Sequence, residues 1–559
     1  MGQAMIETGT RALSRLRTAV LGVFVLAILA GIVQPLYTDE IGWRLQERAG
    51  FDGVDKLLTQ ICGPNTVVRP PPWMMPARYY SALFNSLFAE PLYVRLSGIL
   101  YALVLTAMIL ALIQRVARTA TENFTLTVLA VGLLSLGTMP ILLVWSRPEQ
   151  PILLAFTGAL LVAFSDWKKG EPVAPLADTP ARTAWLRSLT VLLLASVALS
   201  YHVKALFVVP IFLASLYFAS RGRAAHVPRI VAAVLVVVIT AWAAHYWVHR
   251  LECPNAAEVR ANFASNNTGA ALVGATGWSQ ISPLLGRAFE NLSLFQYLGM
   301  PAPRPEPISF WLPAHQVSLH TSFTWFLVLV SLWGIALSLS AFCLAGAPRR
   351  AWRERRLDAR VVFALLLIAG ILGWSASQGY RNPYEAIFVV PMAVLAVILA
   401  LATREKGVPF GGAIEPFAVV IGLLGMGSVV LMAAIYGPVT LRSTGERGYL
   451  KEQPFSISTF GYAGLRRDML AAARKCGIAD PDRSYGLTID DVTYFTFMKS
   501  RMPEHAFGVF PPEPQVEPIG YLQSVRSDGV VASCQRLPPA IQARARREGQ
   551  FCCIAPPNW

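Results

Sequence analysis

The chain is built mainly from long apolar runs that are separated by short polar or basic segments. A helix that crosses the hydrocarbon core of a bilayer needs about 17–25 predominantly apolar residues. Runs of about this length recur from the N-terminus to residue 436. We therefore predict about eleven transmembrane helices, over residues 18–36, 93–114, 124–144, 150–165, 187–202, 204–220, 228–248, 321–346, 361–377, 383–402 and 413–436.

The composition also indicates a membrane protein. Hydrophobic residues make up 54% of the 559 residues and charged residues 14%, whereas a soluble globular protein carries about 25% charged residues. A soluble enzyme and a disordered chain are both excluded. What remains is an all-α polytopic membrane protein, in which helices satisfy the backbone polar groups inside the lipid.

The distribution of positive charge predicts the orientation in the membrane. The formal net charge is +15, and no nucleic-acid motif accompanies it, so we expect no nucleic-acid partner. Short basic loops favour the cytoplasmic side, which places the N-terminus in the cytoplasm. The first apolar run lacks a small-residue cleavage site and is expected to remain as a span. The predicted inner loops carry Arg115, Arg118, Lys168, Lys169, Arg221, Arg223, Arg229, Arg349, Arg350, Arg353, Arg355, Arg356, Arg360, Arg404 and Lys406.

Three long segments fall on the other side of the membrane. They are the loops 37–92 and 249–320 and the tail 437–559, which is long enough to form a small C-terminal α/β domain. The predicted domains are thus a membrane domain over 1–436 and an extracytoplasmic domain over 437–559. An oxidising compartment permits disulfides; the pairs Cys62–Cys253 and Cys476–Cys534 are one hypothesis, and free thiols are the other.

An acidic pair follows the first predicted span. Asp39 and Glu40 stand at the membrane boundary, where one carboxylate can act as a general base and its neighbour can orient a substrate or bind a metal. The alternative is structural, because acidic residues and a Thr38 or Asp39 cap also favour the first turn of a helix.

Three further polar segments lie on the same predicted side. Arg147 and Glu149 lie in the turn between two apolar hairpin helices. They form either an ion pair that belongs to the turn or a site in which Arg147 binds a phosphate or sugar. Lys204 follows His202 between two apolar segments, where it either binds a phosphate or extends towards the interface; a lone histidine is more often structural. The last segment, 379–385, offers Arg381 within an aromatic stretch that would also suit an interfacial belt.

Together these segments bring an acidic pair and three cations to one face of one membrane. Cations at headgroup level suit the phosphate of an anionic lipid. A nearby carboxylate suits the removal of a proton from an acceptor hydroxyl. This combination predicts transfer of a group from a lipid phosphate to an acceptor outside the membrane.

The same motifs resemble those of the GT-C superfamily of polyprenyl-phosphate-sugar glycosyltransferases. The similarity is greatest to the branch of lipid A aminoarabinose transferases and protein O-mannosyltransferases, and it covers residues 1–400. Asp39-Glu40 match the acidic pair after the first helix of that branch. The other matching segments are Arg69-Pro70-Pro71-Pro72-Trp73 with the amphipathic stretch 79–88, then Arg147–Ile152, Lys204, and Arg381…Tyr384…Pro391. The oligosaccharyltransferase motif Trp-Trp-Asp-Tyr-Gly is absent from the sequence, and the tail 437–559 resembles no family we recognise.

The resemblance implies a GT-C-like membrane domain and an inverting glycosyltransferase. The composition, rich in Ala, Arg and Leu, suggests the bacterial inner membrane, and the predicted topology places the active site and the C-terminus in the periplasm. Asp39 is the expected base, with Glu40 or Glu149 orienting the acceptor or the base. The expected residues of the donor-phosphate and substrate site are Lys204, Arg381, Arg147, Glu149, His202, Arg69 and Tyr384. No metal or other cofactor is expected, and a divalent cation beside the second carboxylate is the alternative. The partners would be a polyprenyl-phosphate-linked sugar and a lipid, polysaccharide or protein acceptor.

Two other classes of protein remain open at this point. A transporter or lipid flippase would also place charges near spans, although transporters tend to show inverted repeats and charges at the middle of the membrane. An assembly protein that binds a partner through its tail would leave Asp39 and Glu40 without a role. The sequence specifies neither the sugar nor the acceptor.

Overall fold

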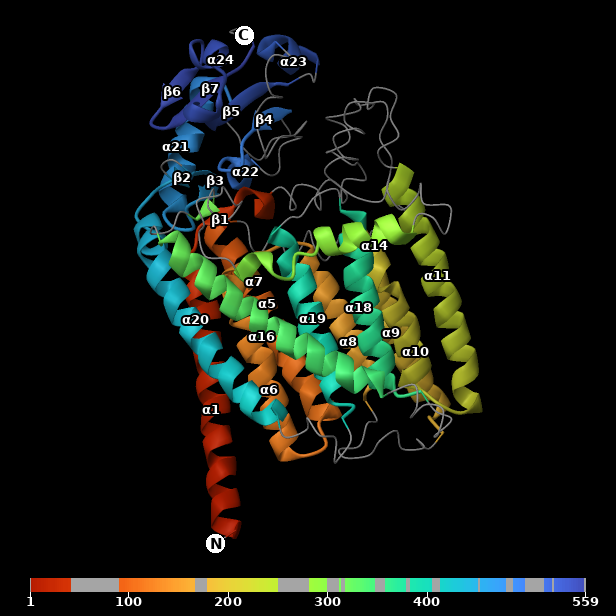
Figure 1. The fold of residues 1–559 in the computed structure, drawn as a ribbon. Helices are drawn as coiled ribbons and strands as arrows, with labels where there is room; N and C mark the ends of the chain where they lie inside the picture. Colours follow the sequence, from red (N-terminus) through yellow and green to blue (C-terminus); the bar gives the residue numbers. More distant parts are fainter. Residues whose placement is uncertain are drawn as a thin grey trace.

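The computed structural model consists of a helical bundle with a smaller α/β domain at one end (Figure 1). The N-terminus lies at the opposite end of the bundle, at the tip of the first helix. The residues that the structure describes are 2–41, 90–165, 178–249, 281–298, 311–312, 317–346, 357–378, 383–404, 413–450, 453–478, 486–497, 517–524 and 527–556.

Seven helices in these ranges are long and apolar enough to cross a membrane. Each coincides with one of the predicted spans, so the protein is an integral membrane protein with a helical bundle as predicted. These helices are α1 (Gly2–Ala30), α5 (Pro91–Val116), α9 (Ala181–Tyr201), α11 (His226–His249), α16 (Leu319–Ala345), α18 (Ala359–Ser377) and α20 (Ile414–Ser443).

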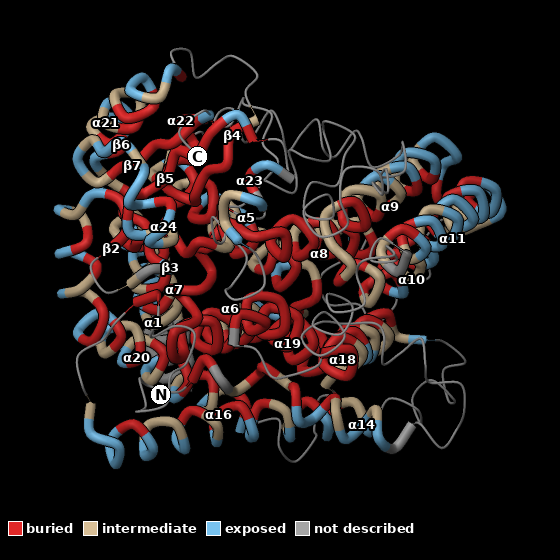
Figure 2. Tube along the Cα trace, turned by 90° about the horizontal axis from the view of Figure 1, so that it is seen from above, coloured by how far each residue is buried: buried red, intermediate tan, exposed pale blue. Residues whose placement is uncertain are grey.

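The remaining four predicted spans contain shorter apolar helices. They are α6 (Ala120–Leu134), α8 (Glu149–Ala163), α10 (Val209–Ala219) and α19 (Ala386–Leu401). All 16 residues of α19 are buried, and Figure 2 shows α19 surrounded by other helices. By contrast, α11 exposes large apolar side chains such as Ile230 and Trp242, which is the surface expected of a helix in contact with lipid.

The predicted span 124–144 is interrupted near its end, and this break leads into the polar site. After α6 the chain turns at Gly137, whose φ is +56°, and continues as the short helix α7 (Met139–Leu143). A Cβ at Gly137 would lie 2.3 Å from the Tyr297 carbonyl oxygen, so the turn requires glycine. Thr138 N then donates to the same carbonyl at 2.9 Å, which anchors the segment that leads to Arg147.

The described arginines of the predicted inner loops lie at the end of the bundle away from the α/β domain. Arg115 closes α5, Arg118 precedes α6, and Arg404 follows α19. Arg118 Nη1 donates to the Arg404 carbonyl at 2.9 Å, and Arg360 Nη1 donates to the Ala402 carbonyl at 2.6 Å. These cations therefore satisfy the free carbonyl groups at the end of α19.

The C-terminal α/β domain is present as predicted, although α20 continues to Ser443, beyond the predicted boundary at residue 436. Helix α21 (Tyr462–Lys475) packs against a four-stranded sheet with the order β4-β5-β7-β6, in which β4 and β5 are parallel and the other pairs are antiparallel. The strands are β4 (Leu487–Ile489), β5 (Gly529–Ser533), β6 (Arg546–Glu548) and β7 (Phe551–Ile554), and the short helices are α22 (Tyr494–Phe497), α23 (Pro518–Ser524) and α24 (Pro539–Gln542).

A second small sheet joins this domain to the bundle. Its order is β1-β3-β2, with β1 (Leu36–Tyr37) contributed by the segment after α1, and β2 (Tyr449–Leu450) and β3 (Gln453–Ile457) contributed by the tail. Tyr37 pairs with Ser456 across the antiparallel β1–β3 ladder. The C-terminal domain is thus hydrogen-bonded to the strand that ends two residues before Asp39.

The cysteine pairing of the tail differs from the predicted one. Cys476 is bonded to Cys553, and Cys534 is bonded to Cys552, so the predicted pair Cys476–Cys534 is wrong. Neighbouring side chains of a strand point to opposite faces of the sheet. Cys553 on β7 therefore meets Cys476 at the end of α21, while Cys552 faces Cys534 on the other side. Cys62 and Cys253 lie outside the described residues.

The two disulfides are expected to contribute unequally to stability, because they close loops of different length. The sequence separations are 77 residues for Cys476–Cys553 and 18 for Cys534–Cys552. Loop-closure entropy makes the double replacement Cys476→Ser/Cys553→Ser cost about 1 kcal/mol more than Cys534→Ser/Cys552→Ser. Thermal unfolding of both variants tests this order. Non-reducing digestion tests the pairing itself, and a Cys476–Cys534 peptide would refute it.

Candidate active site

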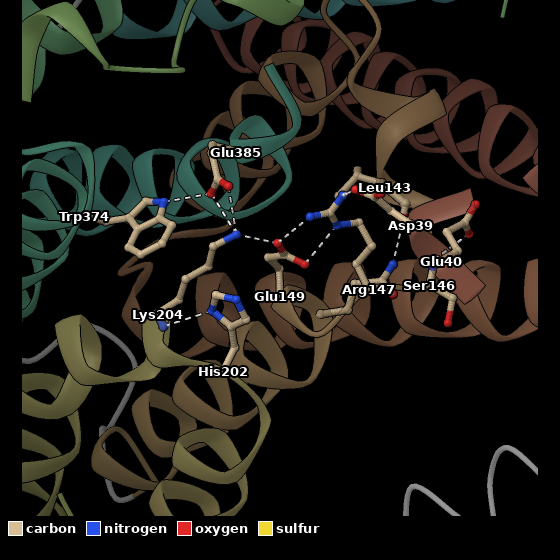
Figure 3. Close-up of polar contacts among 11 residues, drawn as sticks. Asp39, Glu40, Leu143, Ser146, Arg147, Glu149, His202, Lys204, Trp374 and Glu385 are labelled. Carbon is tan, nitrogen blue, oxygen red and sulfur yellow. Dashed lines mark hydrogen bonds and ion pairs between the residues drawn. The ribbon is translucent and has the colours of Figure 1, made fainter. Parts of the chain in front are cut away.

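Five charged side chains from separate segments meet in one cluster (Figure 3). Asp39 lies in the first helical turn after β1, which begins at Thr38 as the structural alternative expected. Arg147 lies in the turn between α7 and α8, and Glu149 in the first turn of α8. Lys204 belongs to the 3₁₀-helix η3 (Val203–Val208), and Glu385 ends the 3₁₀-helix η7 (Pro383–Glu385). Segments that are more than 300 residues apart in the sequence thus form one site.

A continuous chain of ion pairs links these side chains. Arg147 Nη1 donates to Asp39 Oδ2 at 2.9 Å, and its Nε and Nη2 donate to the two oxygens of Glu149 at 3.3 Å each. Lys204 Nζ then bonds Glu149 Oε1 and also reaches Glu385, at 2.8 Å from Oε2. Three carboxylates and two cations therefore alternate, and the cluster carries one net negative charge.

Lys204 is fixed from several sides. Its side chain is 2% exposed, and Nζ lies 4.9 Å from the ring centre of Trp374. The indole Nε1 of Trp374 donates to Glu385 Oε2 at 2.7 Å. Lys204 is therefore a buried cation between two carboxylates and an aromatic face, and the predicted alternative of a side chain that extends towards the interface does not apply.

Asp39 is the most accessible charged group of the cluster. Its side chain is 27% exposed, whereas those of Arg147, Glu149, Lys204 and Glu385 are between 0% and 7% exposed. Burial raises the pKa of Asp39 above its usual value, and the guanidinium of Arg147 opposes this rise. A carboxylate with increased proton affinity at the accessible end of a buried charge network has the properties of a general base.

Glu40 is enclosed, in contrast to its neighbour. Its side chain is fully buried and forms an ion pair with Arg95 at 2.8 Å. It also accepts hydrogen bonds from Tyr37 N at 2.9 Å and Ser146 N at 2.8 Å. Arg95 in turn donates to the carbonyl of Val144 at 2.7 Å. Glu40 thereby ties the Asp39 turn to the Arg147 turn, and this geometry is that of a positioning residue.

Replacing Glu40 tests this role. We expect Glu40→Gln to destabilise the protein by about 3–5 kcal/mol, because it removes the carboxylate charge that pairs with the buried guanidinium of Arg95. Thermal unfolding of the protein in nanodiscs measures the effect. The double variant Glu40→Gln/Arg95→Met should lose less than the sum of the single changes. A stable Glu40→Gln protein without transfer activity would instead assign Glu40 to the chemistry.

His202 contributes to the local fold. It precedes η3, and its Nδ1 accepts a hydrogen bond from Lys204 N at 3.2 Å. The imidazole ring also contacts the rings of Trp247 and Trp374, with centroids 6.0 Å and 6.2 Å away. These contacts support the structural interpretation of His202, which orients the lysine backbone.

Aromatic side chains lie beside the ion pair of Asp39 and Arg147. The ring of Tyr37 stacks on Trp145 with centroids 5.0 Å apart, and its hydroxyl lies 2.8 Å from that of Tyr384. Tyr384 also receives the guanidinium of Arg147 over its ring, at 5.5 Å. The predicted site residue Tyr384 is therefore brought to the cluster, as are Asp39, Arg147, Glu149 and Lys204.

Two predicted site residues, Arg69 and Arg381, lie outside the described residues, as do the motif 69–73 and the stretch 79–88. Three residues of the site were missed. Arg95 falls within the predicted span 93–114, and Trp374 falls within the predicted span 361–377, where an aromatic residue gives no sign of a site. Glu385 stood next to Tyr384 at the start of a span, and its charge at that boundary was the available signal.

Within the described residues, no group of three or more acidic, histidine or cysteine side chains is arranged to hold a metal ion.

Comparison with known proteins gives matches only among solved structures. No protein-family model matches the chain, and no curated protein matches it in sequence. ArnT from Cupriavidus metallidurans bound to undecaprenyl phosphate matches with 14% identity over 98% of both chains and a TM-score of 0.45. The apo oligosaccharyltransferase of Archaeoglobus fulgidus matches with 11% identity over 93% of this chain and 70% of that one, at a TM-score of 0.38. Both are members of the GT-C superfamily that the sequence motifs resemble, and the function of this chain has to be inferred from its own residues.

Proposed function

We propose that the chain is an inverting glycosyltransferase that moves a sugar from a polyprenyl monophosphate to an acceptor hydroxyl. The observation that carries the proposal is the chain of buried ion pairs that ends in the partly exposed Asp39. Buried charges at a membrane surface are costly and favour a function. This network combines two cations suited to a phosphate with one accessible carboxylate suited to a hydroxyl.

The proposed reaction is a single displacement. Asp39 accepts the proton of the acceptor hydroxyl, and the acceptor oxygen forms a bond to the anomeric carbon of the donor sugar. The bond between that carbon and the phosphate oxygen breaks, and its electron pair leaves with the polyprenyl phosphate. Arg147 and Lys204 stabilise the charge on the leaving phosphate. One displacement inverts the anomeric configuration.

The carboxylates that form ion pairs with Arg147 and Lys204 also have a role in this reaction. Glu149 and Glu385 hold Arg147 and Lys204 in place before the donor binds. When the donor binds, its phosphate takes the place of these carboxylates as the partner of the two cations. Arg381, Arg69 and Tyr384 are proposed as further contacts of the donor. The reaction needs no metal, because the phosphate is already a competent leaving group.

The proposed location is the bacterial inner membrane, with the N-terminus in the cytoplasm. The arginines around Ala402 lie at the end of the bundle opposite Asp39, and positive charge favours the cytoplasmic side. The site and the C-terminal domain would then face the periplasm. The donor would enter sideways from the outer leaflet.

The proposal is tested by a cryo-EM map of the nanodisc-embedded protein with undecaprenyl phosphate. We expect the phosphate within hydrogen-bonding distance of Lys204 or Arg147, on the same side as Asp39. A headgroup bound elsewhere, or a continuous polar path across the bilayer, would contradict the proposal and favour a transporter.

A further inference from the structure

Asp491 is a buried carboxyl group in the C-terminal domain that lacks a hydrogen-bond partner among the described residues. Its exposure is 1%, and neither oxygen meets a donor. The neighbouring carboxylate of Asp490 is satisfied, in contrast, because its oxygens accept hydrogen bonds from Thr493 N and Ser533 N at 2.9 Å each. Burying a polar group without a partner costs free energy, so Asp491 destabilises the domain unless a ligand completes its bonds.

The fold brings Asp491 close to Asp39. Asp491 follows β4, and Figure 1 shows the next helix, α22, above the short segment after β1. Ile41 and Val492, which flank the Asp39–Glu40 pair and Asp491, belong to one buried apolar cluster. Burial raises the pKa of Asp491 well above its usual range, Arg536 opposes this rise, and the charges of Asp490 and Asp39 add to it. The shared apolar cluster and this interaction together indicate that both carboxyl groups lie near the boundary between the two domains.

An exposed aromatic ring of the same domain lies beside Tyr37, close to Asp39 in the sequence. Phe455 lies on β3, is 37% exposed, and has its ring centroid 6.4 Å from that of Tyr37. Tyr37 in turn precedes Asp39 by two residues and is paired to β3 through Ser456. The C-terminal domain therefore supplies both an apolar ring and an unsatisfied carboxyl group next to the proposed base.

We propose that Phe455 and Asp491 form an acceptor subsite for a carbohydrate. Phe455 contacts an apolar face of a sugar ring, and Asp491 binds its hydroxyl groups, which insert between the C-terminal domain and the turn that carries Asp39. The inference rests on the proposed function, because it identifies the group that Asp39 deprotonates as a sugar hydroxyl.

The hydrogen-bonding capacity of Asp491 favours this class of ligand. The charges around Asp491 are mixed, because the cation Arg536 acts on it together with the carboxyl groups of Asp490 and Asp39. A hydroxyl group can both donate to and accept from a carboxyl group, and it therefore satisfies Asp491 in either protonation state. An aromatic ring beside polar groups also suits a ring that has one apolar face and a hydroxylated edge.

The test uses the full-length protein in nanodiscs free of glycoside detergents. Saturation-transfer difference NMR measures binding of a panel of methyl glycosides of common hexoses, hexosamines and pentoses. We expect at least one glycoside to bind, and Asp491→Leu and Phe455→Ala each to weaken it at least tenfold. Undecaprenyl phosphate binding, measured in parallel, should be unchanged in both variants.

Two controls separate binding from folding. Asp491→Leu should raise the thermal unfolding midpoint, because it removes an unsatisfied buried carboxyl group, whereas a residue needed only for structure would lower it. Glu548→Gln changes a carboxylate on β6, at the sheet edge opposite β4, and should leave glycoside binding at the wild-type level.

Three results would overturn the subsite: binding of no glycoside by the wild type, full binding by Asp491→Leu, or binding that is lost in EDTA and so reports a bridging cation. Failure of the proposed function would differ from all of these. It would appear as loss of the undecaprenyl phosphate site at Lys204 and Arg147 while glycoside binding through Asp491 persists.

Discussion

Asp39→Asn is expected to reduce sugar transfer by about 100- to 10,000-fold, which is the usual contribution of a general base. The amide can still accept the hydrogen bond that Arg147 donates at 2.9 Å, so the site should keep its geometry. Transfer is measured in membranes by mass spectrometry of the glycans made from endogenous lipid-linked donors. Thermal unfolding of the purified variant should match the wild type.

Asp358→Asn provides a matched control at the other end of the bundle. Asp358 is 22% exposed and bonds Arg360 at 2.7 Å, values close to the 27% and 2.9 Å of Asp39 with Arg147. The same chemical change in a similar ion pair should leave transfer intact. Equal losses of transfer in both variants would mean that the removal of an ion pair, rather than of a base, causes the effect. Unchanged transfer in Asp39→Asn would contradict the proposed mechanism.

Lys204→Met is expected to have the second large effect, on both stability and donor binding. The substitution leaves Glu385 without a cationic partner in the described part of the site and removes one of the two cations on Glu149. Breaking a buried ion pair from one side costs about 3–5 kcal/mol. Undecaprenyl phosphate binding should fall below detection, as followed by the quenching of tryptophan fluorescence.

A double variant separates the two effects of Lys204. Lys204→Met/Glu385→Gln removes one charge of each sign, and Glu149 retains Arg147. We expect most of the lost stability to return, because the uncompensated carboxylate is gone, while phosphate binding remains absent. Phosphate binding by the double variant would show that Lys204 serves only to neutralise Glu385.

Most helices of the membrane domain could be predicted from the sequence, because the property that makes a segment span the membrane belongs to that segment alone. Lipid requires apolar helices that satisfy their own backbone, so each span could be identified without its neighbours. The same reasoning identified Arg147, Glu149 and Lys204, because a charged residue at a span boundary is unusual whatever surrounds it. The turn at Gly137 was missed, since only the Tyr297 carbonyl makes it necessary.

Side-chain roles depended on partners far away in the sequence. Asp39 and Glu40 are adjacent and chemically alike, yet Arg95 encloses Glu40 and leaves Asp39 at the accessible end of the ion chain. Glu385 belongs to the site because α18 places Trp374, and η3 places Lys204, within bonding distance of its carboxylate. The cysteine pairs were decided by which face of β7 each side chain occupies.

The sequence by itself determined that this protein crosses a membrane, where its helices lie, and which boundary residues carry charge, because hydropathy and helix length act over a single segment. Only the tertiary structure decided which charges pair, which carboxylate stays accessible, and that the C-terminal domain reaches Asp39 through β1 and β3. Those features depend on distances between segments that are far apart in the chain, and such distances exist only once the helices and sheets have packed.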